Sequence, residues 1–354
     1  MSTSLGGQRS LGRVAAGVVA MAVAACTGAG EGGGGGGATP TPDPDAPRGE
    51  LSVLTYNVAG LPQEISSENP EEHIPLISPL LDAYDVVLTQ EDFDWWVPAL
   101  DGFDFVHYHE RLRAEATHGH RSGRHPGPEA AGLDPDTRPT LMVGDGLGIM
   151  ARYPFVSRAP EPDVVRQAWP DCFGGFDTSD GGAGDCLAMK GFAMVRLALL
   201  PDVTVDVYTL HAEAGGTERD QELQAEDFEL LADYIEEHSE GHAVILGGDT
   251  NLHTDSDHPD AAAGADTEIW TTFLERTGLT DTCAALDCPE TDAIDKIAVR
   301  DGANLDLTPT AHDFPRERFR TEDGEDLSDH PPLVVEIEWV VTGDRDAGGD
   351  EPRS

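Results

Sequence analysis

The most unusual feature of this 354-residue sequence is how few basic residues it contains. Its 22 Lys and Arg residues face 67 Asp and Glu residues, which gives a formal net charge of −45, and only Lys190 and Lys296 are lysines. A surface with this charge repels polyanions at long range, so a long nucleic acid would need a strongly basic local groove. Extreme acidity also keeps an exported protein soluble, and by itself it does not identify a substrate.

The N-terminal apolar run, Val14–Ala25, is too short to span a bilayer. It follows Arg9 and Arg13, which is the arrangement of a signal peptide. The run ends in Val-Ala-Ala before Cys26, which resembles the lipobox of bacterial lipoproteins, where the cysteine becomes lipid-modified. We therefore expect residues 1–25 to be a signal peptide and Cys26 to anchor an exported protein to the bacterial cell surface. An ordinary secretory signal, with release of the protein, is the alternative.

The rest of the chain divides into a linker, one folded domain and a tail. Residues 26–49 are rich in Gly and then in Pro, with too few apolar groups to pack, and residues 342–354 form an acidic tail that we expect to be disordered. The whole chain has the 39% apolar content of a globular protein, and residues 50–341 are long enough for one α/β domain. Within them, the polar stretch 107–138 shows no periodicity and suggests a solvated loop, or a mobile loop that touches a phosphate head group.

Four cysteines follow Cys26, an even number that suggests disulfides in an exported chain. Proximity in the sequence favours Cys172–Cys186 and Cys283–Cys288 as the pairs. The first would contribute about 3 kcal/mol by the chain-entropy argument. A zinc site is the alternative, but the Cys-x-x-Cys spacing is missing.

Strand-like and helix-like segments alternate along the domain, as expected for an α/β fold. The segments that we expect to be strands are short, β-branched and apolar: Leu51–Val58, Asp85–Thr89, Gly146–Met150, Phe192–Leu200, Val203–Leu210, Ala243–Leu246, Ile294–Val299 and Leu333–Trp339. Helical patterns cover Pro70–Ala83, Thr217–Glu237 and Thr267–Arg276. Because polar groups follow several of these strands, we expect them to meet at one edge of a sheet, where active sites of α/β proteins lie.

The polar groups at the strand ends suit the hydrolysis of a phosphodiester. Carboxylate and amide oxygens are the ligands that Mg²⁺ prefers, and Glu91, Asn57 and Asp329 could supply them to Mg²⁺ or another divalent cation such as Mn²⁺. A base that works near neutral pH is best provided by a histidine whose tautomer a carboxylate fixes. His330 with Asp295 fits this role.

Three further residues complete the expected site. His211 could donate a hydrogen bond to the phosphoryl oxygens and stabilise their developing charge. Asp249 and Asn251 are one residue apart, so on an alternating backbone both side chains can face the phosphate or the attacking water.

These segments occur in an order that resembles the endonuclease/exonuclease/phosphatase, or DNase I-like, superfamily. The ordered set is TYNVAGLP, LTQEDF, GDGLGIMARYPF, LHAEAG, GGDTNL, AIDKI and LSDHPP. It looks closest to bacterial sphingomyelinase-like and phospholipase C-like members. The resemblance implies a four-layer α/β/β/α sandwich, with Glu91 as the main metal ligand and Asn57 nearby. It also implies that Asp295 orients His330 and that Asp249 and Asn251 lie at the phosphate and the water.

We therefore expect a metal-dependent phosphodiesterase that acts on a phospholipid such as sphingomyelin. The DNA-gripping basic loops of the nucleases are not recognisable here, which together with the net charge argues against nucleic acid as the substrate. A secreted nuclease of the same fold and a phosphomonoesterase are the alternatives, and an inactive binding module is a third. The expected partners are the substrate and, through Cys26, a membrane; nothing in the sequence implies a protein partner.

Overall fold

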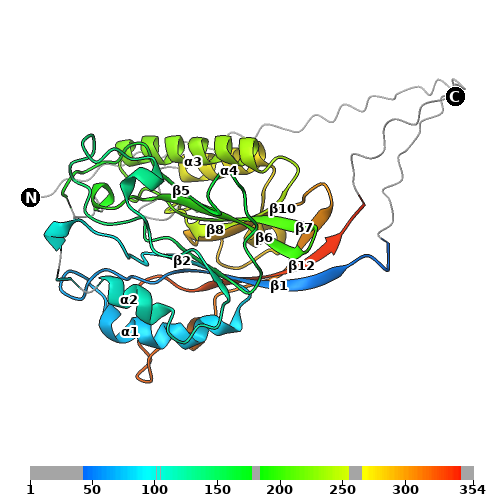
Figure 1. Ribbon diagram of the computed structural model, residues 1–354, viewed down its shortest axis with the longest axis horizontal. Coiled ribbons are helices and arrows are strands. Elements are labelled where there is room, and N and C mark those ends of the chain that lie inside the picture. Colours follow the sequence, from blue (N-terminus) through cyan, green and yellow to red (C-terminus); the bar gives the residue numbers. More distant parts are fainter. Residues whose placement is uncertain (1–42, 101, 104, 178–183, 255–264, 344–354) are drawn as a thin grey trace, which may run out of the picture. The chain divides into compact units, whose positions relative to one another are not determined.

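The computed structural model describes residues 43–100, 102–103, 105–177, 184–254 and 265–343. The expected signal peptide, Cys26, most of the linker and the end of the tail lie outside these residues. The described chain forms two six-stranded sheets. Helices lie on the outer side of each sheet, so that the layers run helix, sheet, sheet, helix (Figure 1).

The first sheet contains the N-terminal and C-terminal strands side by side. In spatial order its strands are β11 (Leu305–Asp313), β12 (Leu333–Val341), β1 (Arg48–Asn57), β2 (Val86–Gln90), β4 (Gly148–Ala151) and β3 (His120–Arg121). Strand β1 pairs parallel with β2 and antiparallel with β12. The segment just before β12 therefore reaches the same sheet edge as the ends of β1 and β2.

The second sheet has the same arrangement of one parallel pair among antiparallel neighbours. Its strands, in spatial order, are β5 (Val164–Ala168), β6 (Gly191–Leu200), β7 (Val203–His211), β8 (Ala243–Asp249), β10 (Asp295–Arg300) and β9 (Thr280–Asp281). Strands β7 and β8 are parallel, and β10 runs antiparallel to β8. The ends of β7 and β8 thus meet the start of β10.

Helices α1 (Pro70–Ile77) and α2 (Phe105–Leu112) cover the first sheet, and α3 (Glu218–His238) and α4 (Ala265–Thr277) cover the second (Figure 1). A one-turn helix, α5 (Thr282–Ala285), follows β9. Short 3₁₀ helices span Ser78–Ala83, Pro98–Leu100, Pro128–Ala131, Asp185–Leu187 and Arg316–Arg318. The helix expected over Pro70–Ala83 is therefore an α-helix followed by a 3₁₀ helix.

Strands that are buried on both faces explain why the strand segments are almost continuously apolar. In β1, Val53 faces the core between the sheets, whereas its neighbours Leu54 and Tyr56 pack under α1 and α2. In β8, Ile245 faces the inter-sheet core and Leu246 packs under α3 and α4. Each such side chain contributes about 1.5–3 kcal/mol when it is fully buried. This packing confirms the expected four-layer sandwich.

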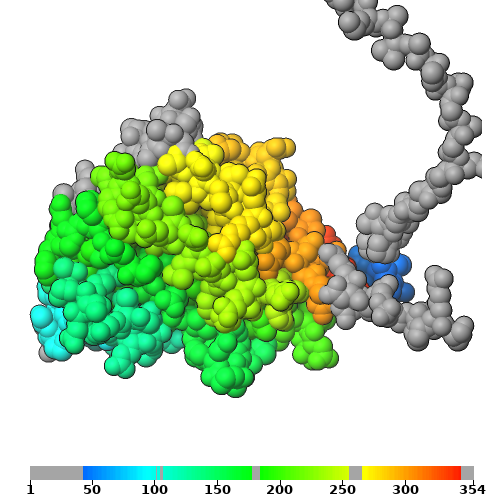
Figure 2. Space-filling view, turned by 90° about the horizontal axis from the view of Figure 1, so that it is seen from above, coloured from blue at the N-terminus to red at the C-terminus, as the bar shows by residue number. Residues whose placement is uncertain are grey.

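Helix α3 begins with a capping box, because the Thr217 side chain accepts from the Asp220 backbone and Asp220 accepts from the Thr217 N–H. Its buried positions include Leu223, Phe228 and Leu231, as the sequence pattern predicts. Figure 2 views the side of the molecule on which α3 and α4 lie next to each other, and a groove between them is lined by residues of both helices.

Both expected cysteine pairs are disulfides in the structure. Cys172 is bonded to Cys186, and Cys283 is bonded to Cys288 across α5. None of the helices in the described part of the chain is both long and apolar enough to cross a membrane.

Candidate active site

The expected site residues lie at one edge of the two packed sheets. Asn57 ends β1, and Glu91 directly follows the neighbouring β2. In the second sheet, His211 and Asp249 are register partners at the ends of β7 and β8, and Asp249 is also opposite Asp295 at the start of β10. Strand pairing within each sheet and packing of the two sheets therefore bring together residues that are up to 238 positions apart in the sequence, from Asn57 to Asp295.

Asn57 connects the two sheets at this edge. Its side-chain amide nitrogen donates to Glu91 Oε1 at 3.0 Å and to Asp249 Oδ2 at 3.1 Å. Its amide oxygen accepts from the Ala59 backbone N–H at 3.1 Å. The first carboxylate follows a strand of one sheet and the second ends a strand of the other. This buried amide therefore holds the two halves of the site in register.

His330 lies between two buried carboxylates. Its Nδ1 is 2.9 Å from Asp295 Oδ2, and its Nε2 is 3.6 Å from Asp249 Oδ2. Burial alone would lower the pKa of His330, but Asp295 and Asp249 outweigh burial and hold this pKa well above its usual value. The predicted pairing of His330 with Asp295 is present, and one oxygen of each carboxylate and one ring nitrogen lie within 4.8 Å of one another.

His211 is the second imidazole of the site. Its Nε2 is 3.4 Å from the same Asp249 oxygen, whereas its Nδ1 is buried without a hydrogen-bond partner. Burial, with help from the neighbouring Lys190 charge, lowers the pKa of His211 to about 3. His211 is thus neutral where His330 is readily charged, so the two imidazoles are suited to different tasks.

Glu91 is held in an uncommon backbone conformation, with a φ of 56°. Burial raises the pKa of its carboxyl, although Asn57 and His330 oppose the shift. The next residue, Asp92, anchors the loop because it accepts from Arg113 Nη1 at 2.9 Å and lies 2.8 Å from His109 Nδ1. The strained residue that is expected to bind a metal thus precedes a buried ion pair.

The prediction of a solvated loop for residues 107–138 is wrong. This segment contains the end of α2, strand β3 and a 3₁₀ helix. The side chains of His109, Arg113, His118 and His125 are buried. The polar residues looked like a surface loop because their partners, such as Asp92 and Asp145, lie elsewhere in the sequence. The segment supports the loop after Glu91.

Asn251 and Asp329 lie at the border of the group. Asn251 follows the end of β8 with a φ of 50°, and its side-chain amide donates to the Ala212 carbonyl. Asp329 is exposed, and the Ser328 hydroxyl lies 3.2 Å from its Oδ1 and 2.7 Å from the Asn57 carbonyl. A cleft of about 470 Å³ next to His330 is lined by Asp295, Asp329 and Arg316, among other residues. The site is therefore open to solvent on the side of His330.

Lys190 is a member of the site that sequence reasoning left out. It is buried just before β6 and forms an ion pair with Asp185. Its charge also acts on His211, Asp249 and Glu91. The signal in the sequence was the rarity of lysine, since one of only two lysines precedes a strand whose partner ends in His211.

A profile of the endonuclease/exonuclease/phosphatase family matches residues 54–330. The chain belongs to this family. A sphingomyelinase of Mycobacterium bovis is 30% identical to it over 302 residues, which cover 83% of this chain and 54% of the relative. The chain thus spans about half the length of the curated relatives that it matches.

Two solved structures show the same fold at low identity. Beta toxin from Staphylococcus aureus, a mutant with bound magnesium ions, aligns with a TM-score of 0.52 at 15% identity, over 81% of this chain and 99% of the toxin. Danio rerio TDP2, in complex with a single-strand DNA product, aligns with a TM-score of 0.51 at 17% identity, over 81% of this chain and 98% of TDP2. At these identities the alignments establish the DNase I-like fold and leave the substrate open.

Proposed function

We propose that this protein is a metal-dependent phosphodiesterase that acts on a phospholipid such as sphingomyelin. The observation that carries the proposal is the buried group of Asp249, Asp295 and His330, joined through Asn57 to Glu91. These residues supply the acceptors, the imidazole and the open cleft that hydrolysis of a phosphodiester requires.

The donor set fits a divalent cation such as Mg²⁺ or Mn²⁺. The Asn57 side chain donates to Glu91 and Asp249, and the Ser328 hydroxyl links the Asn57 carbonyl to Asp329. The buried cation Lys190, whose charge acts on Glu91 and Asp249, is paired with Asp185. Oxygen donors with an excess of negative charge are what these ions prefer. Glu91, Asn57 and Asp329 would hold the ion, and the ion would supply positive charge that neutralises the phosphate.

The imidazole groups would carry the proton transfers. Asp295 accepts from His330 Nδ1, which leaves Nε2 directed toward Asp249. The positive charge of a bound ion would favour the neutral ring, whose Nε2 would then take a proton from an attacking water. Neutral His211 would donate a hydrogen bond to a phosphoryl oxygen. Asp249 and Asn251 would position the phosphate or the water.

Two observations support a lipid over DNA. The M. bovis relative that shares 30% identity is a sphingomyelinase. The formal charge of −45 opposes the approach of a polyanion. We also propose, from the sequence alone, that Cys26 anchors an exported bacterial lipoprotein. Mass spectrometry of the N-terminal peptide from membranes, with Cys26→Ser as the control, tests the anchor: an unmodified Cys26 in mature protein would contradict it.

Assays of the purified protein against sphingomyelin, phosphatidylcholine and plasmid DNA test the function. We expect Mg²⁺-dependent release of a phosphorylated head group, loss of activity in excess chelator, and no nicking of the plasmid at equal enzyme concentration. Glu91→Gln should abolish the response to Mg²⁺, whereas His107→Ala, which changes an exposed side chain outside the site, should not. Plasmid nicking without release of a head group would favour a nuclease. Full activity in chelator would refute the metal requirement.

A further inference from the structure

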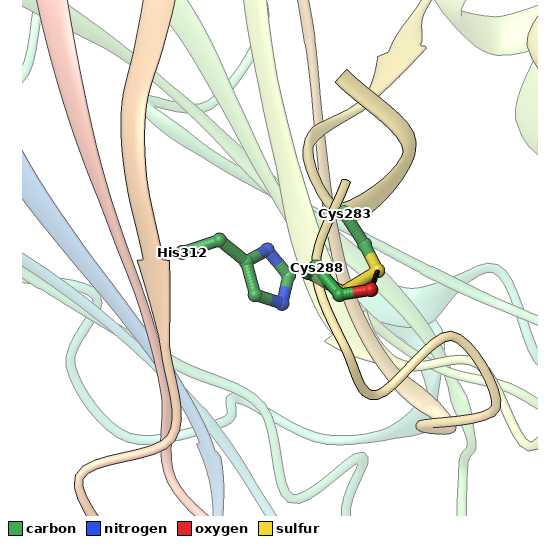
Figure 3. A group of neighbouring side chains, drawn as sticks. All are labelled: Cys283, Cys288 and His312. Carbon is green, nitrogen blue, oxygen red and sulfur yellow. Dashed lines mark hydrogen bonds between the residues drawn. A yellow bond between two sulfur atoms is a disulfide. The ribbon is translucent and has the colours of Figure 1, made fainter. Parts of the chain in front are cut away.

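The second disulfide lies against a histidine that no sequence pattern links to it. Figure 3 shows Cys283 and Cys288 joined by their sulfur atoms, with the His312 ring extending toward them from β11. One ligand atom from each of the three residues fits within a span of 4.8 Å. The same small cavity is bordered by Lys296 and Asp295. This cavity and the cleft beside His330 share Asp295 and Glu290 in their linings, so the arrangement lies next to the proposed active site.

The hydrogen bonds around His312 determine which nitrogen carries the proton. The Thr282 hydroxyl donates to the Ile297 carbonyl at 2.8 Å, so its oxygen is left to accept from His312 Nδ1 at 3.1 Å. The remaining nitrogen, Nε2, is buried and has no hydrogen-bond partner. Burial also lowers the pKa of His312, which keeps the ring neutral. A neutral imidazole with its N–H held by a hydrogen bond and its other nitrogen unpaired is the form that binds a metal.

We propose that reduction of the Cys283–Cys288 disulfide creates a site for a zinc-class divalent cation, which the two thiolates and His312 Nε2 bind. Two molecules of a small thiol would supply the two electrons and two protons, so that the S–S bond breaks, two cysteine thiols form and the two reductant molecules leave joined as their own disulfide. Binding of the cation would then release the two thiol protons and form two sulfur–metal bonds. The same three side chains would thus form either a disulfide or a metal site.

The ligand set and its spacing agree with zinc. Zinc binds cysteine sulfur and histidine nitrogen in tetrahedral sites, and the four residues between Cys283 and Cys288 are within the usual range for such pairs. Tetrahedral ligands of zinc lie about 3.5–4 Å apart, which follows from metal–ligand distances of about 2.0–2.3 Å. A span of 4.8 Å therefore requires only a small inward movement, together with separation of the two sulfurs. A water molecule would complete the four ligands.

The charges around His312 favour a cation, and the other disulfide of the protein provides a control. Asp281 and Glu290 act on the His312 ring and favour a cation, whereas Lys296 opposes it. Cys172 and Cys186 form the other disulfide, but no third Cys, His, Asp or Glu ligand completes a metal group with them among the described residues. Reduction of the full protein opens both disulfides, so the first pair is an internal control.

The experiment measures zinc binding to the full-length protein before and after reduction with a phosphine. Bound zinc per chain is determined after gel filtration, and alkylation of each cysteine is determined by peptide mapping. The reduced protein should bind one more zinc ion per chain than the oxidised protein, and zinc should protect Cys283 and Cys288 but not Cys172 and Cys186. His312→Ala should abolish the protection. Thr282→Val, which removes the hydrogen bond to Nδ1, should weaken binding by about 10–100-fold.

Three results would overturn the proposal: equal zinc binding by the reduced and oxidised proteins, protection that persists in His312→Ala, or protection of the first cysteine pair instead. Zinc bound at the phosphodiesterase site is subtracted with a Cys283→Ser/Cys288→Ser variant. If circular dichroism shows that reduction unfolds the chain, the reduced protein is refolded with and without zinc. We then expect zinc to restore the spectrum of the wild type but not that of His312→Ala. A wild-type spectrum that zinc does not restore, or an equal recovery of His312→Ala, would also overturn the proposal.

Discussion

At the scale of single residues, two buried carboxyls in the loop after Glu91 have opposite relations to their surroundings. Asp92 is paired with Arg113 and His109, and although burial opposes them, these partners hold its pKa well below the usual value. For Asp94, burial outweighs the attraction of His109 and raises the pKa to about 6. The same residue type thus stabilises the fold at one position and costs stability at the other when it is charged.

Replacement of these two carboxyls by amides should therefore change stability in opposite directions at pH 7. Asp94 holds its proton more tightly in the folded protein than in the unfolded chain. Its contribution to the free energy of unfolding is therefore fully present below about pH 4 and is lost as the pH rises through 6. Asp94→Asn should raise the free energy of unfolding at pH 7 by up to about 3 kcal/mol and flatten its pH dependence between about pH 4 and 6. Asp92→Asn should lower it by about 3–5 kcal/mol, because Arg113 is left buried without its partner.

Urea unfolding of both variants at several pH values measures these effects. A stabilised Asp92→Asn protein, or an Asp94→Asn protein with unchanged pH dependence, would contradict the assigned roles.

His330 should matter for turnover far more than for substrate binding. His330→Ala removes the group proposed to accept the proton of the attacking water, so kcat should fall by about 10²–10⁴-fold with a smaller change in KM. Asp295→Asn should cost less, because the ring remains but loses the partner at 2.9 Å that orients it. The double variant should be little worse than His330→Ala, since the two residues act as one unit. Steady-state kinetics and melting temperatures on the same preparations separate this role from a structural one, and near-normal turnover of folded His330→Ala would refute it.

Sequence reasoning recovered the residues that end or follow strands and missed those whose partners are distant. Asn57, Asp249 and Asp295 stand at strand ends, where a polar residue after an apolar run is visible in the sequence. The pairing of Arg113 with Asp92 is invisible there, because it depends on how the segment 107–138 folds back over the loop after Glu91. A local sequence pattern does not show which polar side chains become buried by contacts with distant segments.

At the scale of single elements, the start of α3 is stabilised by its own capping box. Thr217→Ala removes the side-chain acceptor for the Asp220 N–H and should lower the free energy of unfolding by about 1 kcal/mol. Thr271→Ala changes an exposed position inside α4 and is the matched control, with an expected change within about 0.5 kcal/mol. Chemical denaturation of both variants gives the comparison. Equal effects at the two positions would mean that the cap contributes nothing.

The central strands were predictable and the edge strands were not. Strands such as β7 and β8 are buried on both faces, so apolar residues point to both sides of the sheet and dominate their sequences. Strand β11 was missed because it lies at the edge of its sheet, where most of its residues beyond Leu307 face solvent and a register shift occurs next to Pro309. An edge strand gains less from apolar side chains, and its sequence carries less of the pattern.

At the scale of the whole molecule, the formal charge of −45 should make stability depend on salt. Mutual repulsion of the carboxylates opposes the compact state, and raising ionic strength from about 0.01 M to about 0.15 M shortens the Debye length from about 30 to about 8 Å. We expect the melting temperature at pH 7 to rise over this range. Sodium chloride and sodium sulfate at equal ionic strength distinguish screening from ion-specific effects, and a melting temperature that falls with both salts would contradict the argument.

The bridge made by Asn57 has a mechanical consequence. The two sheets meet through apolar side chains, which resist separation but do not by themselves define how far one sheet may slide along the other. The hydrogen bonds from Asn57 to Glu91 and to Asp249 cross that boundary. The distance between these two carboxylates therefore depends on how the two sheets are aligned. It follows that a cavity made by Val53→Ala or Val207→Ala, in the middle of the layer, should disturb the site from a distance. Neither sheet alone can then carry a working half of the site, and heat should inactivate the protein only as the layers lose their alignment.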